Sequence, residues 1–215
     1  MQEIEDLSVG GSVKFKGPIK FRRVNVSGAM KIEGEASGEE LSVSGSGKVE
    51  GNLRVEELTI AGTLKVSGDL EAESVEVAGT LSVGGELKGD SVEVAGSLKA
   101  SKVMADTLTI SGAAKAEEFN ANTVEIKKKS KASGRIVASE VRIGKDTEVD
   151  EVVAEEVRVG KGAEVRLIEG VEVWVGRDSE IEELRYVEEA HIDEKATVDR
   201  IERIERLSRE PPKRD

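Results

Sequence analysis

The sequence predicts an all-β protein that folds as a single three-sided parallel β-helix of about twelve coils. Three observations carry this prediction. A short apolar motif returns at a nearly constant step, apolar and polar residues alternate within each repeat, and aromatic residues make up only 2% of the chain. Together they indicate short strands that coil around a narrow interior.

The repeated motif is an apolar residue, any residue and then Val or Ile. Val75-Glu-Val77, for example, returns as Val92-Glu-Val94. The twelve occurrences begin at Leu7, Val24, Leu41, Leu58, Val75, Val92, Leu108, Val124, Val141, Val157, Val173 and Ala190. The third position is β-branched every time, which suits a strand with one buried face.

Each repeat contains three short strands. In residues 75–91 the inward positions form three pairs, at 75 and 77, at 81 and 83, and at 87 and 89. Each pair spans too few residues for a helix, so we expect three strands and three turns per coil. Coils stacked about 4.8 Å apart would give a length of roughly 55 Å. The narrow interior explains why aromatic residues are scarce.

The repeats divide the chain into three parts. Residues 1–6 are expected to be a short tail, residues 7–207 the β-helix, and residues 208–215 a polar C-terminal tail. In "RIERIERL" apolar residues recur every third position, at Ile201, Ile204 and Leu207. This spacing drifts around a helix of about 3.6 residues per turn. We therefore assign the stretch to the last coil, with a C-terminal helix as the alternative.

Composition limits the function classes. There is no Cys, the net charge is −12, and no apolar run is long enough to span a membrane as a helix. These features exclude disulfides and thiolate metal sites, and they argue against general nucleic-acid binding and membrane spans. We expect a cytoplasmic protein without a cofactor. The 35% of charged residues, with both signs mixed, is typical of thermophile surfaces.

Two families of β-helix compete. "IGKDTEV", "VGKGAEV" and "VGRDSEI" resemble the hexapeptide repeats of left-handed acyltransferases, but those coils need three equal hexapeptides, and the steps in this chain are shorter. The stretch "LSVGGSVKFKGPIKF", with the coils that follow it, resembles bactofilins, the polymer-forming cytoskeletal proteins, and an archaeal or thermophilic member in particular. This resemblance covers about residues 7–207. It implies a right-handed three-sided β-helix that polymerises end to end without nucleotide and scaffolds client proteins. The short N-terminal tail argues against membrane attachment.

Two surface features are candidate binding sites. Arg142, Arg158, Trp174 and His191 occupy the same outward position in successive coils, so Arg158 is expected to stack on the indole. This column is either a binding strip or a plain outward ladder. The second feature is the run "KKKSK", with Lys127, Lys128, Lys129 and Lys131. It is either a contact for an anionic partner or a solvated turn.

No enzyme site is expected. The chain has one His, and the repeats carry no loop insertion that could build a cleft around its many carboxylates. The open coil ends instead predict self-association, because they expose strand edges and core. The N-terminal joint is expected at Val13, Phe15, Ile19 and Phe21, and a C-terminal contact at Ile201, Ile204 and Leu207. Pairing of both ends gives a filament, and pairing of one end gives a dimer. The alternative function is a non-polymerising binding module.

Overall fold

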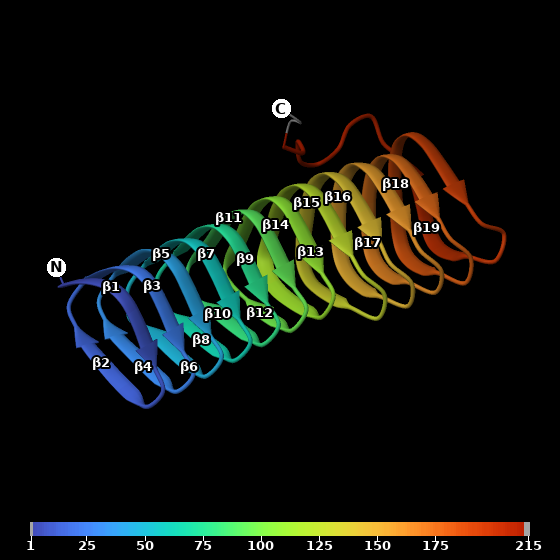
Figure 1. The fold of residues 1–215 in the computed structure, drawn as a ribbon. Coiled ribbons are helices and arrows are strands. Elements are labelled where there is room, and N and C mark those ends of the chain that lie inside the picture. The colour runs from blue at the N-terminus through green and yellow to red at the C-terminus, as the bar shows by residue number, and fades with distance from the viewer. Residues whose placement is uncertain (1, 213–215) are drawn as a thin grey trace. The chain divides into compact units, whose positions relative to one another are not determined.

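The computed structural model describes residues 2–212, which form nineteen strands and contain no helix. The strands are parallel and stack as a β-solenoid of about twelve coils, so the predicted fold class is confirmed (Figure 1). The chain divides into two compact units, Met1–Met104 and Ala105–Asp215. Strand β13 (Lys102–Ile110) begins in the first unit and ends in the second.

In the first unit every coil uses one long and one short strand. The strands are β1 (Gln2–Val9), β2 (Ser12–Lys16), β3 (Ile19–Val26), β4 (Ala29–Glu33), β5 (Ala36–Val43), β6 (Ser46–Val49), β7 (Leu53–Ile60), β8 (Thr63–Val66), β9 (Leu70–Val77), β10 (Thr80–Val83), β11 (Glu86–Val94) and β12 (Ser97–Lys99). Odd-numbered strands β1 to β11 pair with one another, and so do even-numbered strands β2 to β12. Each residue lies over its counterpart one repeat later, as Leu53 lies over Leu70.

Each long strand bends around a corner of the coil. In β7 the inward residues Leu53, Val55, Leu58 and Ile60 are buried, and two consecutive exposed residues, Glu56 and Glu57, interrupt the alternation. Two adjacent outward side chains place a corner between the two inward pairs. With the short strand β8 as the third side, the coil has the three sides that the sequence predicted.

In the second unit a single strand runs around most of each coil. The strands are β14 (Ala113–Ile126), β15 (Lys131–Ile143), β16 (Glu148–Val159), β17 (Glu164–Val175), β18 (Glu180–Ile192) and β19 (Thr197–Arg203). They pair in order from β14 to β19. Each of the four turns from β14 to β18 contains a left-handed residue, with φ of 55–66°: Lys129, Asp146, Gly162 and Asp178.

The interior is filled by ladders of Val, Ile, Leu and Ala, but it also holds rings. Phe119 is fully buried and Phe21 is nearly so. Phe21 fits because its partner in the next coil is Gly38, where a Cβ would lie only 2.3 Å from the ring. The narrow interior that the scarcity of aromatic residues predicted therefore still holds rings, and at Phe21 a small neighbour makes the space.

The two termini differ from the simple repeat. Strand β1 begins at Gln2, inside the stretch expected to be a tail, and it pairs with β3 from Gln2↔Ile19 onward. At the other end β19 is a strand, with Val198 under Ile181 and Ile201 under Leu184, rather than a helix. After Ile204 the chain leaves the stack and runs back toward β15 (Figure 1).

Candidate functional site

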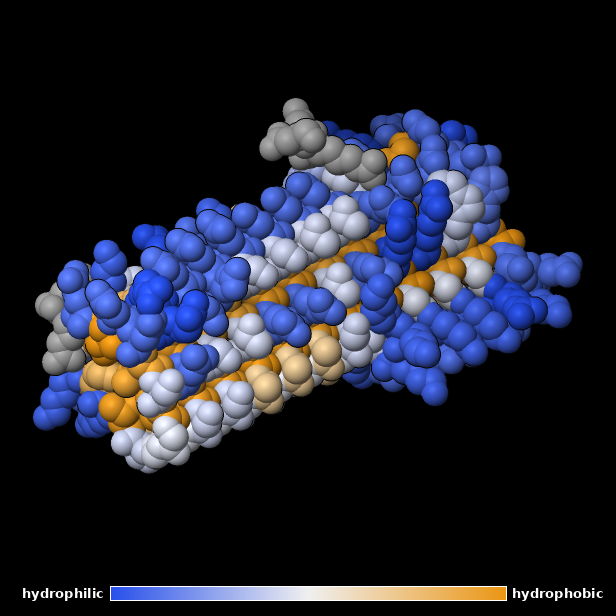
Figure 2. Space-filling view, viewed as in Figure 1, coloured by the Kyte–Doolittle hydropathy of each residue, from blue (hydrophilic) through white to orange (hydrophobic). Residues whose placement is uncertain are grey.

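The N-terminal end of the first unit is an open coil. Its strands β1 and β2 pair with β3 and β4, in registers such as Val13↔Met30 and Phe15↔Ile32. Both strands are edges of the stack on their other side, so their backbone groups on that side face outward. Figure 2 shows hydrophobic surface gathered at this end.

The structure separates the four residues expected at this joint. Val13 and Phe15 lie on β2 and are half-buried. Ile19 and Phe21 lie one layer further in, because Gln2 and Ile4 of β1 pair directly over them. The open end is therefore formed by Val13 and Phe15 together with Ile4 and Leu7, which are also half-buried. The sequence could have predicted that Ile4 lies in this coil, since Ile4 precedes Phe21 by one full repeat.

The C-terminal end of the second unit is open as well. Ile201 is 52% exposed on β19, and Ile192 is 36% exposed on β18. Ile204 extends the ladder by donating its N–H to the carbonyl of Tyr186, and Leu207 is half-buried. Ile192 was missed as an end residue because it also fits the repeat as an inward position. The following segment does not cover this end, because the N–H of Ser208 bonds to Glu169 instead.

A ladder of ion pairs lies beside the N-terminal end. Lys14 and Lys31 reach one carboxylate oxygen of Glu33 at 2.6 and 2.9 Å, and Lys31 also reaches Glu50 at 3.0 Å. Hydrogen bonds from Lys14 and then Lys31 lower the pKa of Glu33 to about 2. The groups are partly or fully exposed to solvent, so salt screens the pairs and they add little to stability.

The aromatic column forms as the sequence predicted. Arg158 lies over Trp174 at 5.0 Å from the ring centre, and Trp174 stacks on His191 with ring centres 5.8 Å apart and planes 19° apart. The Nε2 atom of His191 is 3.2 Å from Glu189. Both faces of the indole therefore contact neighbouring side chains, and only its edge is presented outward. This geometry favours an outward ladder over a stacking site.

The lysine run lies on the turn between β14 and β15. Lys127 pairs with Glu125 at 2.5 Å, and Lys131 pairs with Glu148 of the next coil. Lys129 occupies the left-handed position of the turn, with φ of 58°. Neighbouring carboxylates thus neutralise part of the positive charge of the lysine run. This arrangement favours a solvated turn over a contact for an anionic partner.

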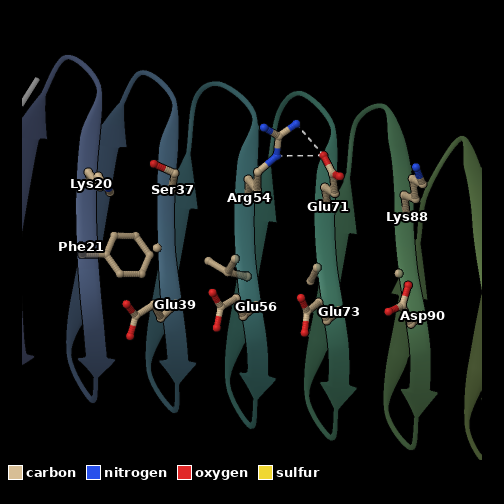
Figure 3. A pocket seen from close by; sticks show the side chains of 14 residues that line it. Lys20, Phe21, Ser37, Glu39, Arg54, Glu56, Glu71, Glu73, Lys88 and Asp90 are labelled. Atoms are coloured by element: carbon tan, nitrogen blue, oxygen red, sulfur yellow. Dashed lines mark hydrogen bonds and ion pairs between the residues drawn. The ribbon is translucent and has the colours of Figure 1, made fainter.

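The first unit also has a shallow outer groove of about 530 Å³. Figure 3 shows its two rows of side chains, one including Lys20, Arg54 and Glu71 and the other formed by Glu39, Glu56, Glu73 and Asp90. Arg54 pairs with Glu71 at 2.6 Å. In residues 2–212 no group of three or more His, Cys, Asp or Glu side chains is arranged to hold a metal ion. The same residues contain no helix long and apolar enough to cross a membrane.

Comparison with known families matches residues 7–101 to the bactofilin family, described as polymer-forming cytoskeletal. The match ends close to the boundary of the first compact unit at Met104, so the bactofilin resemblance is confirmed for these coils. The sequence resemblance was drawn further, to about residue 207. No curated protein and no solved structure matches the chain.

Proposed function

We propose that the chain is a structural scaffold that assembles end to end through its open coil ends, without nucleotide. Support for the scaffold role comes from the bactofilin segment and the β-solenoid fold. The single observation that carries the assembly step is the open first coil, where Val13 and Phe15 lie on an edge strand. An uncovered edge of this kind is a template for pairing with another chain.

The free energy available at such a joint is adequate. Burial of roughly 400 Å² of apolar surface on each partner contributes about 10 kcal/mol per partner at about 25 cal/mol per Å², or about 20 kcal/mol in total. Association costs offset a large part of this. Backbone hydrogen bonds across the joint would fix the register and the direction in which the two chains pair. Micromolar pairing is therefore within reach of a small apolar end.

The partner of the N-terminal end is proposed to be another copy of the chain. If it pairs with the C-terminal end, where Ile192 and Ile201 are exposed, the contact is head-to-tail and a filament results. If it pairs with itself, the product is a two-fold dimer. We place the protein in the cytoplasm, where it would organise protein clients rather than catalyse a reaction.

The test is Val13→Arg combined with Phe15→Arg, examined by light scattering and negative-stain microscopy without nucleotide. The matched control is Ser12→Arg, because Ser12 is exposed on the same strand and the substitution adds charge without changing the apolar end. We expect the parent and the control to assemble and the double variant to stay monomeric. Assembly of a folded double variant at the parent concentration would exclude this end as the joint.

A further inference from the structure

The C-terminal segment Ser208–Pro212, called the strap below, lies on the outer surface of the second unit. The backbone N–H of Ser208 donates a hydrogen bond to a carboxylate oxygen of Glu169 on β17 at 3.0 Å. The carbonyl of Pro212 accepts a hydrogen bond from the hydroxyl of Ser139 on β15 at 2.5 Å. Between these two anchors the strap must cross β16.

The strap is long enough to reach from β17 to β15. From β17 to β15 is two coil spacings, about 10 Å. The chain bends at Ser208 and Arg209, and the three residues that follow span about 9 Å if they are extended at about 3.1 Å each. Pro211 and Pro212 favour this conformation because their rings hold φ at about −65°.

The strap covers a strip of apolar side chains that point outward. Ile136 and Ala138 are buried inside the coil, so Val137 between them points to the outer face, and Val153 lies beside it in the next coil. Outward residues in a β-helix are normally exposed, yet Val137 is 3% and Val153 is 1% exposed. Their neighbours in the same column are Asn120 and Glu169, so the apolar strip is confined to the coils where the strap crosses.

Polar contacts fix both sides of this strip. The carboxylate of Glu169 is buried and also accepts a hydrogen bond from Arg185 at 2.9 Å. Arg209 of the strap lies 3.7 Å from Glu118 on β14. The surface therefore offers a buried acceptor and an apolar floor in one column, with the hydroxyl donor Ser139 on one side of the column and the carboxylate of Glu118 on the other.

We propose that the outer face of β15–β17 is a docking groove for a peptide segment that contains prolines and an arginine, and that the strap is its occupant in cis. The partner should carry the same groups as the strap. These are a backbone N–H that bonds to Glu169, two prolines that pack on Val137 and Val153, and a cation that pairs with Glu118. Recognition of a preformed proline-rich segment by an apolar groove is a recurring mode of peptide binding. A partner peptide must displace the strap, so the segment autoinhibits the groove.

The direct test uses a variant that lacks residues 208–215 and a fluorescent peptide with the sequence of residues 206–213. We expect the peptide to bind the truncated protein and to bind the full chain at least about tenfold more weakly, because a strap closed nine-tenths of the time lowers apparent affinity by that factor. A peptide with both prolines replaced by glycine should bind more weakly. No binding to a folded truncated protein, or equal binding to both proteins, would overturn the proposal.

A second test keeps the chain at full length. Val153→Lys places a charge under the strap without touching the inward ladder. The matched control is Glu180→Lys, since Glu180 is exposed on β18 and lies outside the columns of Val153 and Ser139. We expect trypsin to cut after Arg209 at least several-fold faster in Val153→Lys than in the parent or the control, and we expect this variant not to gain peptide affinity. Unchanged cleavage with a retained fold would show that the valines are not what holds the strap, and the docking groove would be refuted.

Discussion

Replacement of Gly62 by Ala should destabilise the first unit, because consecutive coils touch at this turn. A Cβ at Gly62 would lie 2.0 Å from the carbonyl oxygen of Gly45 and 2.4 Å from that of Ser44. Both neighbours are backbone atoms of the preceding coil, so no side-chain rotation can relieve the contact. The two coils would have to separate by about 1 Å to restore an ordinary van der Waals distance.

The cost can be worked out from the hydrogen bonds at the same turn. The N–H groups of Ala61 and Gly62 both bond to Val43, and that of Thr63 bonds to Gly45, each at 2.9 Å. Such a separation would break or weaken all three. At about 1 kcal/mol for each, the loss is about 3 kcal/mol. For a chain of this size the melting temperature should fall by about 6–12 °C.

Thermal unfolding followed by circular dichroism measures this effect, and Gly11→Ala is the matched control. Gly11 occupies the same turn three coils earlier, but a Cβ there meets nothing within 4 Å because no coil precedes it. We expect this control to melt within about 2 °C of the parent. Equal melting of Gly62→Ala and the parent would show that consecutive coils do not touch at this turn.

Three further predictions concern the core, the ion pairs and the aromatic column. Phe119→Ala should cost about 3–5 kcal/mol in denaturant unfolding, because the ring is fully buried and its removal leaves a cavity; a loss below about 1 kcal/mol would contradict the packing. The pKa of Glu33 is lowered from 4.5 to about 2, so its contribution is complete above pH 4.5 and disappears as the pH falls toward 2. Glu33→Gln should remove this part of the acid sensitivity at low salt, and an unchanged acid titration of stability would refute it. Trp174→Ala should cost no more than about 1 kcal/mol, since its contacts with Arg158 and His191 are exposed; a larger loss in the same unfolding assay would give the column a structural role.

The sequence was sufficient for the coil register because inward residues repeat at a fixed step. Leu58 lies over Val75, Val124 over Val141, and Val157 over Val173, as the alignment of repeats predicts. The stack of Arg158, Trp174 and His191 follows from the same register. A β-solenoid allows this because each coil contacts only its neighbours, so local spacing determines the three-dimensional contact.

The ends were less predictable, since a residue in an end coil pairs with a repeat partner on one side only. Ile4 matches Phe21 one coil later, but a single pair of residues is weak evidence for a strand. The strap was missed because Ser208–Pro212 reads as a polar tail. Val137 and Val153 carried a signal, as valines in an outward column, but their meaning depends on a contact between segments far apart in sequence. Periodicity does not report such contacts.

The concentration dependence of assembly without nucleotide tests the scaffold function most directly. Sedimentation velocity of the parent from low to high micromolar concentration, with microscopy of the same samples, would distinguish the states. End-to-end pairing predicts particles whose lengths are multiples of one chain at constant width, and their loss in the Val13→Arg and Phe15→Arg double variant. A parent that stays monomeric at high micromolar concentration would contradict the account.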